Sequence, residues 1–139
     1  MKSVNLRLFS LFAVCVVACF GFAGASLGAD LSAADKQFLG VYEKIHKALV
    51  ADDLASVKTA AADLGAAGAD LAKSASLTEA RTSFAKLGDK AVKLAAGQPG
   101  YFILYCPMVN KEWVQTSPDV ANPYGGKDMV GCGEVKAKP

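Results

Sequence analysis

Apolar residues recur every three or four positions through three successive stretches after residue 30, and this spacing constrains the fold more than any other feature. The first stretch places these residues on one helical face: Phe38, Val41, Tyr42, Ile45, Ala48 and Leu49. Ser32 followed by Asp35 resembles a capping box at its start. The pattern predicts helices over residues 32–51, 53–73 and 77–96.

Short connections join these three predicted helices, which favours antiparallel neighbours. Gly65 and Gly68 weaken the second helix, although small residues on an apolar stripe also let helices approach closely. The third helix is expected to end at 97–100, where the sequence reads Gly-Gln-Pro-Gly. We therefore expect a mainly α fold that is built on an antiparallel three-helix bundle.

The periodicity changes after Pro99. Residues 101–106 are aromatic and β-branched enough for a short strand, and Trp113-Val114 suggests a second extended piece. Asn122-Pro123-Tyr124-Gly125-Gly126 is a strong turn signal. The C-terminal segment 101–135 is accordingly predicted to be irregular, with short strands packed on the bundle.

The N-terminus has the order of a secretory signal peptide. Lys2 and Arg7 precede a stretch from Leu8 to Ala29 that has no charged residue, and small residues occupy 23–25. We expect residues 1–29 to be removed, leaving a single periplasmic or secreted domain over 30–139. An uncleaved anchor is one alternative, and a lipoprotein attached through Cys19 is another, in which case the domain would remain at a membrane.

Removal of the signal changes the charge balance. Residues 30–139 hold 13 basic and 13 acidic residues, because Lys2 and Arg7 leave with the signal. A chain without net positive charge is a poor partner for nucleic acid. The sequence also has no Cys-x-x-Cys pair, phosphate-binding Gly-rich loop, or Ser/His/Asp set that could use its single histidine, so we do not expect an enzyme.

Four sulfur-bearing residues in the C-terminal segment are the candidate site. Cys106 and Met108 are two apart in a predicted extended segment, so they can face one point, and Met129 and Cys132 can do the same on a turn. Thiolates and thioethers are soft donors that favour Cu(I) over hard cations, and Ag(I) is equally soft. His46, on the edge of the first apolar stripe, is a further candidate ligand.

A disulfide between Cys106 and Cys132 explains the same residues without a metal. An oxidising compartment favours it, and the bridge would stabilise so small a domain by roughly 3 to 4 kcal/mol in the chain-entropy model. Met108 and Met129 would then fill gaps in the core. The residues alone leave the metal and the disulfide about equally open.

The C-terminal pattern also resembles a known family. Tyr105-Cys106-Pro107-Met108, Trp113, Asn122-Pro123-Tyr124 with Gly126 and Met129, and Cys132-Gly133-Glu134-Val135 are similar to the signature of the domain-of-unknown-function family numbered 3347. The similarity extends over roughly residues 35 to 135. The chain departs from the pattern at Gly125, where we expect an aromatic residue and therefore a looser turn.

The resemblance implies an exported bacterial domain of a kind also attached to the adaptor subunits of copper and silver efflux pumps. It implies no enzymatic activity. It favours Cu(I) or Ag(I) as cargo, a periplasmic efflux or metal-handling protein as partner, and Cys106, Met108, Met129 and Cys132 as ligands. The alternative is a disulfide-stapled helical interaction module that holds no metal.

Overall fold

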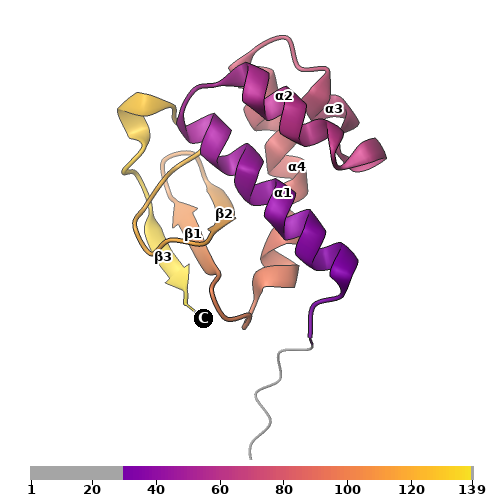
Figure 1. The fold of residues 1–139 in the computed structure, drawn as a ribbon. Coiled ribbons are helices and arrows are strands. Elements are labelled where there is room, and N and C mark those ends of the chain that lie inside the picture. Colours follow the sequence, from indigo (N-terminus) through magenta and orange to yellow (C-terminus); the bar gives the residue numbers. More distant parts are fainter. Residues whose placement is uncertain (1–29, 139) are drawn as a thin grey trace, which may run out of the picture.

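The computed structural model describes residues 30–138, in which four helices pack together and a small antiparallel sheet follows (Figure 1). The helices are α1 (Ala33–Val50), α2 (Leu54–Ala62), α3 (Ala69–Ala72) and α4 (Leu77–Ala95). The strands are β1 (Phe102–Cys106), β2 (Lys111–Gln115) and β3 (Glu134–Ala137). This confirms the mainly α fold with short C-terminal strands. The predicted signal peptide and Cys19 lie outside the described residues.

Polar side chains cap the three longer helices. The side chains of Ser32, Asp53 and Ser76 accept hydrogen bonds from backbone N–H groups three residues later, at the starts of α1, α2 and α4. Each cap satisfies an amide that has no partner within its helix. The boundaries of α1 and α4 consequently lie within one residue of those predicted.

The second predicted helix is not continuous. It divides into α2, a 3-10 turn η1 (Gly65–Gly68) and the single-turn helix α3. Gly65 has a φ of 55°, a left-handed conformation that glycine adopts readily. Gly68 lies so close to the Ala61 carbonyl that a Cβ at this position would collide with it. The glycines therefore fold the chain back on α2 rather than only weakening a helix.

The C-terminal segment is more regular than expected. Its sheet has the strand order β2-β1-β3, with Leu104 of β1 facing Trp113 on one side and Val135 on the other. The sequence pattern did not predict β3, which reads Glu-Val-Lys-Ala and forms because β1 offers it an unpaired edge. Figure 1 shows how the central strand β1 thereby connects the hairpin to the end of the chain.

The sheet is attached to the helices through a chain of aromatic rings. Tyr42 of α1 stacks on Phe84 of α4 with ring centroids 4.4 Å apart. Tyr124, in the loop before β3, lies 5.9 Å from Phe84 and 6.3 Å from Trp113 of β2. Such ring contacts add to the stabilisation from apolar burial. This row of rings fixes the loop that carries the candidate site against the bundle.

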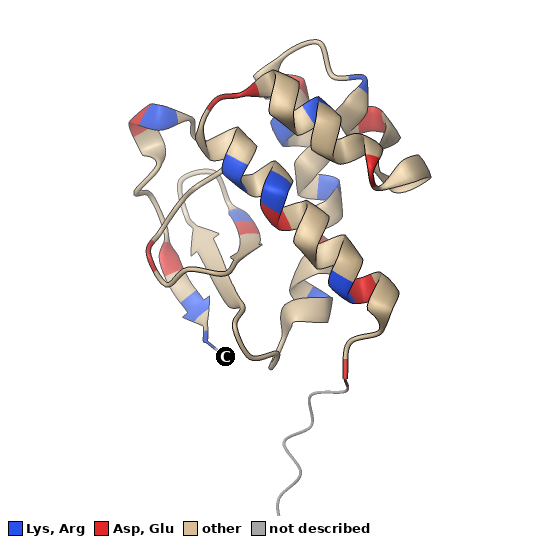
Figure 2. Cartoon of the chain, viewed as in Figure 1, with Lys and Arg blue, Asp and Glu red and all other residues tan. Residues whose placement is uncertain are grey.

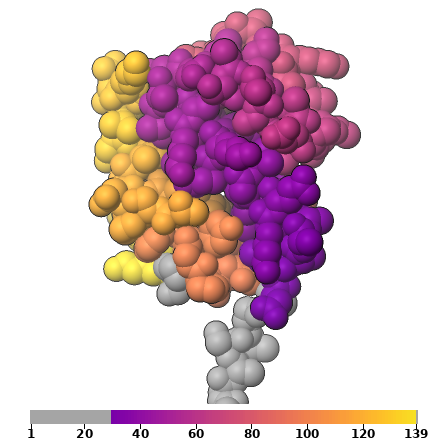
Figure 3. Space-filling view, in the orientation of Figure 1, coloured from indigo at the N-terminus to yellow at the C-terminus, as the bar shows by residue number. Residues whose placement is uncertain are grey.

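The surface carries both signs of charge. Figure 2 shows lysines and acidic residues interspersed along α1, around α2 and α3, and on the sheet. In the space-filling view the C-terminal segment covers one side of α1 (Figure 3). Among the described residues, no helix has the length and apolar character needed to cross a membrane.

Candidate functional site

The two cysteines of the C-terminal segment meet at one end of the sheet. Cys106 is the last residue of β1, where it is fully buried beside Leu104 and Trp113. Cys132 lies just before β3 and is half-buried. Both are free thiols, and their Sγ atoms lie 2.7 Å apart. The structure therefore brings together two of the four sulfur-bearing residues that the sequence predicts as ligands.

Hydrogen bonds to the sulfur favour ionisation of Cys106. Burial by itself raises the pKa of this thiol, but bonds from the Cys132 thiol, the backbone amides of Val109 and Met108, and the Asn122 side chain lower it below the ordinary value. The pKa of Cys132 is raised, first because its thiol bonds to Cys106. The hydrogen bonds thus make Cys106 the more acidic thiol of the pair, with the Cys132 thiol donating to its sulfur.

A buried asparagine holds the two cysteines in place. The Nδ2 of Asn122 donates to the carbonyl of Cys132 at 2.8 Å, and its Oδ1 accepts from the backbone amide of Tyr124 at 2.8 Å. Its own amide donates to the carbonyl of Val130 at 2.8 Å. Sequence reasoning read Asn122 only as part of a turn. An asparagine before a proline indicates only the turn, so the sequence carried no signal for this buried role.

Gln115 organises the loop that leads to Asn122. Its buried side chain accepts from the indole Nε1 of Trp113 at 2.8 Å and donates to the carbonyl of Ser117 at 2.8 Å. The amide of Ala121 donates to the same Oε1 at 3.3 Å. This buried network ties the loop to β2, and no spacing in the sequence indicated it.

His46 supports the same loop from the helical side. It is 3% exposed, and its Nε2 lies 2.7 Å from the carbonyl oxygen of Ala121, next to Asn122. Its Nδ1 has no hydrogen-bond partner and lies 3.8 Å from a carboxylate oxygen of Glu43. The bond from the buried ring to the Ala121 carbonyl gives His46 a positioning role for the loop.

The stability of the protein is expected to depend on pH through His46. Burial lowers its pKa below the ordinary 6.5; the bond to Ala121 and the charge of Glu43 raise it, and Lys47 lowers it, with a net decrease. The unfolded chain then binds a proton more readily than the folded one. The contribution of His46 to the free energy of unfolding should therefore be complete above pH 6.5 and should fall as the pH decreases below 6.5.

Urea denaturation between pH 5 and pH 8 measures this effect. His46→Gln can still donate a hydrogen bond but does not titrate, so its stability should change less over the same range. An equal decrease in the variant would assign the pH dependence to other groups.

The two methionines differ in their surroundings. Met108, in the turn between β1 and β2, is 75% exposed. Met129, in the 3-10 turn η2 (Lys127–Met129), packs over Gly125, and its Sδ lies 3.1 Å from where a Cβ of residue 125 would be. An aromatic residue at position 125 would collide with this side chain. Met129 thus occupies the space that a side chain at position 125 would need.

Arg81 joins three elements behind the loop. From α4 its Nε donates to the carbonyl of Pro123 at 3.0 Å, and one Nη donates to the carbonyl of Leu49 at 3.3 Å. The guanidinium also pairs with Asp52, which has a φ of 57° at the corner between α1 and α2. These bonds fix the loop 119–133 next to Asn122.

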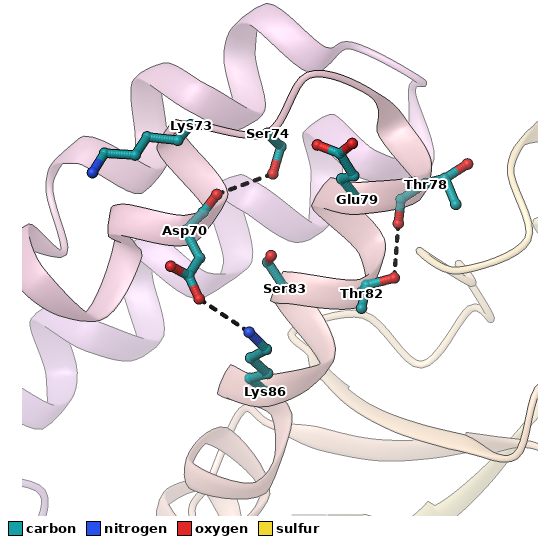
Figure 4. Close-up of a pocket in the computed structure, with 8 residues that line it drawn as sticks. All are labelled: Asp70, Lys73, Ser74, Thr78, Glu79, Thr82, Ser83 and Lys86. Carbon is teal, nitrogen blue, oxygen red and sulfur yellow. Dashed lines mark hydrogen bonds and ion pairs between the residues drawn. The ribbon is translucent and has the colours of Figure 1, made fainter.

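A separate polar hollow lies between α3 and the start of α4. Its volume is about 400 Å3, and Figure 4 shows hydroxyl and charged side chains around it. The Nζ of Lys86 lies 3.0 Å from Asp70, and the Ser74 hydroxyl donates to the carbonyl of Asp70 at 3.1 Å. Glu79 accepts from the amide of Ala75. These groups already bond to one another, so the thiol pair is the better candidate.

Residues 30–138 contain no group of three or more His, Cys, Asp or Glu side chains arranged to hold a metal ion. Comparisons with protein-family models, curated proteins and solved structures found no match. The resemblance to the family numbered 3347 therefore stays a prediction.

Proposed function

We propose that this is an exported protein that binds Cu(I) or Ag(I) and buffers it or transfers it to an efflux system. Cys106 and Cys132 are the primary ligands, and the thioether of Met108 is the third. The observation that carries the proposal is the 2.7 Å separation of two free thiols, one of which has its pKa lowered by the hydrogen bonds to its sulfur. Export rests on the pattern of residues 1–29 alone.

The chemistry of the donors supports a soft monovalent ion. Thiolates select Cu(I), and a thioether adds a soft ligand without adding charge. At a metal–sulfur bond of about 2.3 Å, as for zinc, two sulfurs around one ion lie roughly 3.8 to 4.6 Å apart. The pair must therefore open by about 1 to 2 Å, and Cys132, on the irregular loop, is the one that can move.

Exposure divides the ligand set into a fixed part and an exchangeable part. Cys106 is fixed by β1 and by its hydrogen bonds, while Met108 is 75% exposed two residues away. An exposed thioether can leave the ion and be replaced by a sulfur from another protein. In this proposal Met129 and His46 position the loop and do not bind the ion.

Anaerobic titration of the reduced protein with Cu(I), in competition with a chromogenic chelator, tests the proposal. We expect one ion per chain, a loss of about 100-fold or more in affinity for Cys106→Ala/Cys132→Ser, and a loss of about 10-fold for Met108→Leu. Met129→Leu is the matched control, because it also removes a thioether, and it should bind like the wild type. Unchanged affinity in the double cysteine variant would refute the site.

The short distance between the sulfurs also favours a second candidate, a disulfide-stapled interaction module without metal. In that case the reduced protein would bind Cu(I) no more tightly than the double cysteine variant. Its free energy of unfolding would rise by roughly 3 to 4 kcal/mol on oxidation, as expected for a bridge over this loop.

A further inference from the structure

The two thiols are unequally accessible. Cys106 is 0% exposed at the end of β1, whereas Cys132 is half-buried and follows the exposed residues Val130 and Gly131. Met108 and Val130 are the large hydrophobic residues that stay exposed in the described part of the chain, and each lies two positions from one of the cysteines. A reagent from solution therefore reaches the sulfur of Cys132 before that of Cys106.

The distance between the two Sγ atoms is intermediate between that of a disulfide and that of two ligands of one ion. At 2.7 Å they are close to the roughly 2.05 Å of a disulfide and short of the spacing that two ligands of one ion require. A small closing movement forms a covalent bond, and a small opening movement admits an ion. One pair of atoms cannot do both at the same time.

We propose that thiol–disulfide exchange with a small disulfide such as oxidised glutathione closes this site, with Cys132 as the attacking thiol and Cys106 as the resolving thiol. The exchange chemistry stands on the geometry alone. Its consequence, that oxidation blocks Cu(I) binding, rests on the proposed function.

The exchange proceeds in two balanced steps. Cys132, which has the higher pKa but is the more accessible thiol, loses its proton as it attacks one sulfur of the external disulfide; it forms a mixed disulfide and releases the first thiol, which takes up that proton. Cys106 then attacks the Cys132 sulfur, forms the internal disulfide and releases the second thiol. Two protein thiols are oxidised, and one external disulfide is reduced to two thiols, which take up the two protons. A small dithiol reverses the reaction and reopens the site.

Mass spectrometry of metal-free protein treated with oxidised glutathione tests the order of attack. The wild type should lose two protons without keeping an adduct. Cys106→Ala should keep one glutathione on Cys132, and Cys132→Ser should form its adduct about tenfold more slowly, because access limits the reaction. Equal rates, a reversed order or a lasting adduct on the wild type would overturn the assignment.

Brief alkylation of the reduced wild type gives the same information without a variant that could fail to fold. A substoichiometric dose of iodoacetamide, followed by peptide mapping, should modify Cys132 in preference to Cys106. Preferential modification of Cys106 would contradict the proposal.

A third measurement tests whether the disulfide blocks Cu(I) binding, separately from whether the protein binds Cu(I) at all. Cu(I) titration of the oxidised and the reduced protein should show binding only in the reduced form, with recovery after treatment with a dithiol. Equal binding in both forms would refute the proposal that the disulfide blocks binding, while the proposed Cu(I) binding would stand. Absence of binding in both forms, with the ordered exchange observed, would refute only the proposed function.

Discussion

Gly133→Ala will lower the free energy of unfolding by about 2 to 4 kcal/mol, because a strained backbone and a collision act together. Gly133 has a φ of 149°, which L residues rarely adopt. A Cβ there would lie 2.6 Å from the Cη2 of Trp113 and 3.2 Å from the carbonyl oxygen of Tyr105. The indole is fully buried and cannot withdraw. Urea denaturation of the reduced protein measures the loss.

Gly131→Ala is the matched control on the other side of Cys132. Nothing lies within 4 Å of a Cβ at this position, and Gly131 is not among the glycines with positive φ. Its stability should stay within about 0.5 kcal/mol of the wild type. Equal effects of the two substitutions would show that the contact with Trp113 does not limit residue 133. If only Gly133→Ala loses stability, the Cu(I) affinity that we propose should fall as well, because residue 133 directly follows Cys132.

Asn122→Ala will cost about 2 to 4 kcal/mol, since it leaves two partly buried backbone groups without partners. These are the carbonyl of Cys132 and the amide of Tyr124, both bonded to the Asn122 side chain at 2.8 Å. The variant also removes a donor to the sulfur of Cys106, so the pKa of that thiol should rise. Denaturation in urea and the pH dependence of alkylation at Cys106 measure the two effects.

Asn122→Asp distinguishes the donor from the acceptor. The aspartate can still accept from the amide of Tyr124, but it has no N–H for Cys132 and places a negative charge near Cys106. We expect a larger increase in the pKa of Cys106 than for Asn122→Ala, because like charge disfavours the thiolate. If neither variant changes the pKa of Cys106, that pKa is lowered by the Cys132 thiol and the amides of Val109 and Met108 without Asn122.

Local sequence patterns predicted the helices because helix formation and capping depend on residues only a few positions apart. The repeat in α1 and the caps at Ser32 and Ser76 act within a few residues, so the boundaries of α1 and α4 follow from the sequence. The aromatic and β-branched run of β1 is equally local. The break between α2 and α3 was missed because Gly65 could be read either as a weak point or as a turn.

Longer-range features could not be predicted in this way. β3 is polar, and its assignment depends on the free edge of β1. Asn122 was predicted only as part of a turn, His46 as a candidate ligand on the edge of an apolar stripe, and no role was predicted for Gln115, since a sequence does not show which carbonyls a buried side chain will reach. The value of such residues as supports for the site becomes visible only in the tertiary structure.

The sequence by itself determined the helical periodicity, the capping residues and the presence of soft sulfur donors in the C-terminal segment. The tertiary structure decided that Cys106 and Cys132, 26 positions apart, lie side by side. It also decided that Met129 packs on Gly125 and that His46 bonds to a carbonyl. The physical reason is range: helix formation and donor chemistry depend on neighbours along the chain, whereas the meeting of two sulfurs depends on how the sheet and its loop pack against α1 and α4.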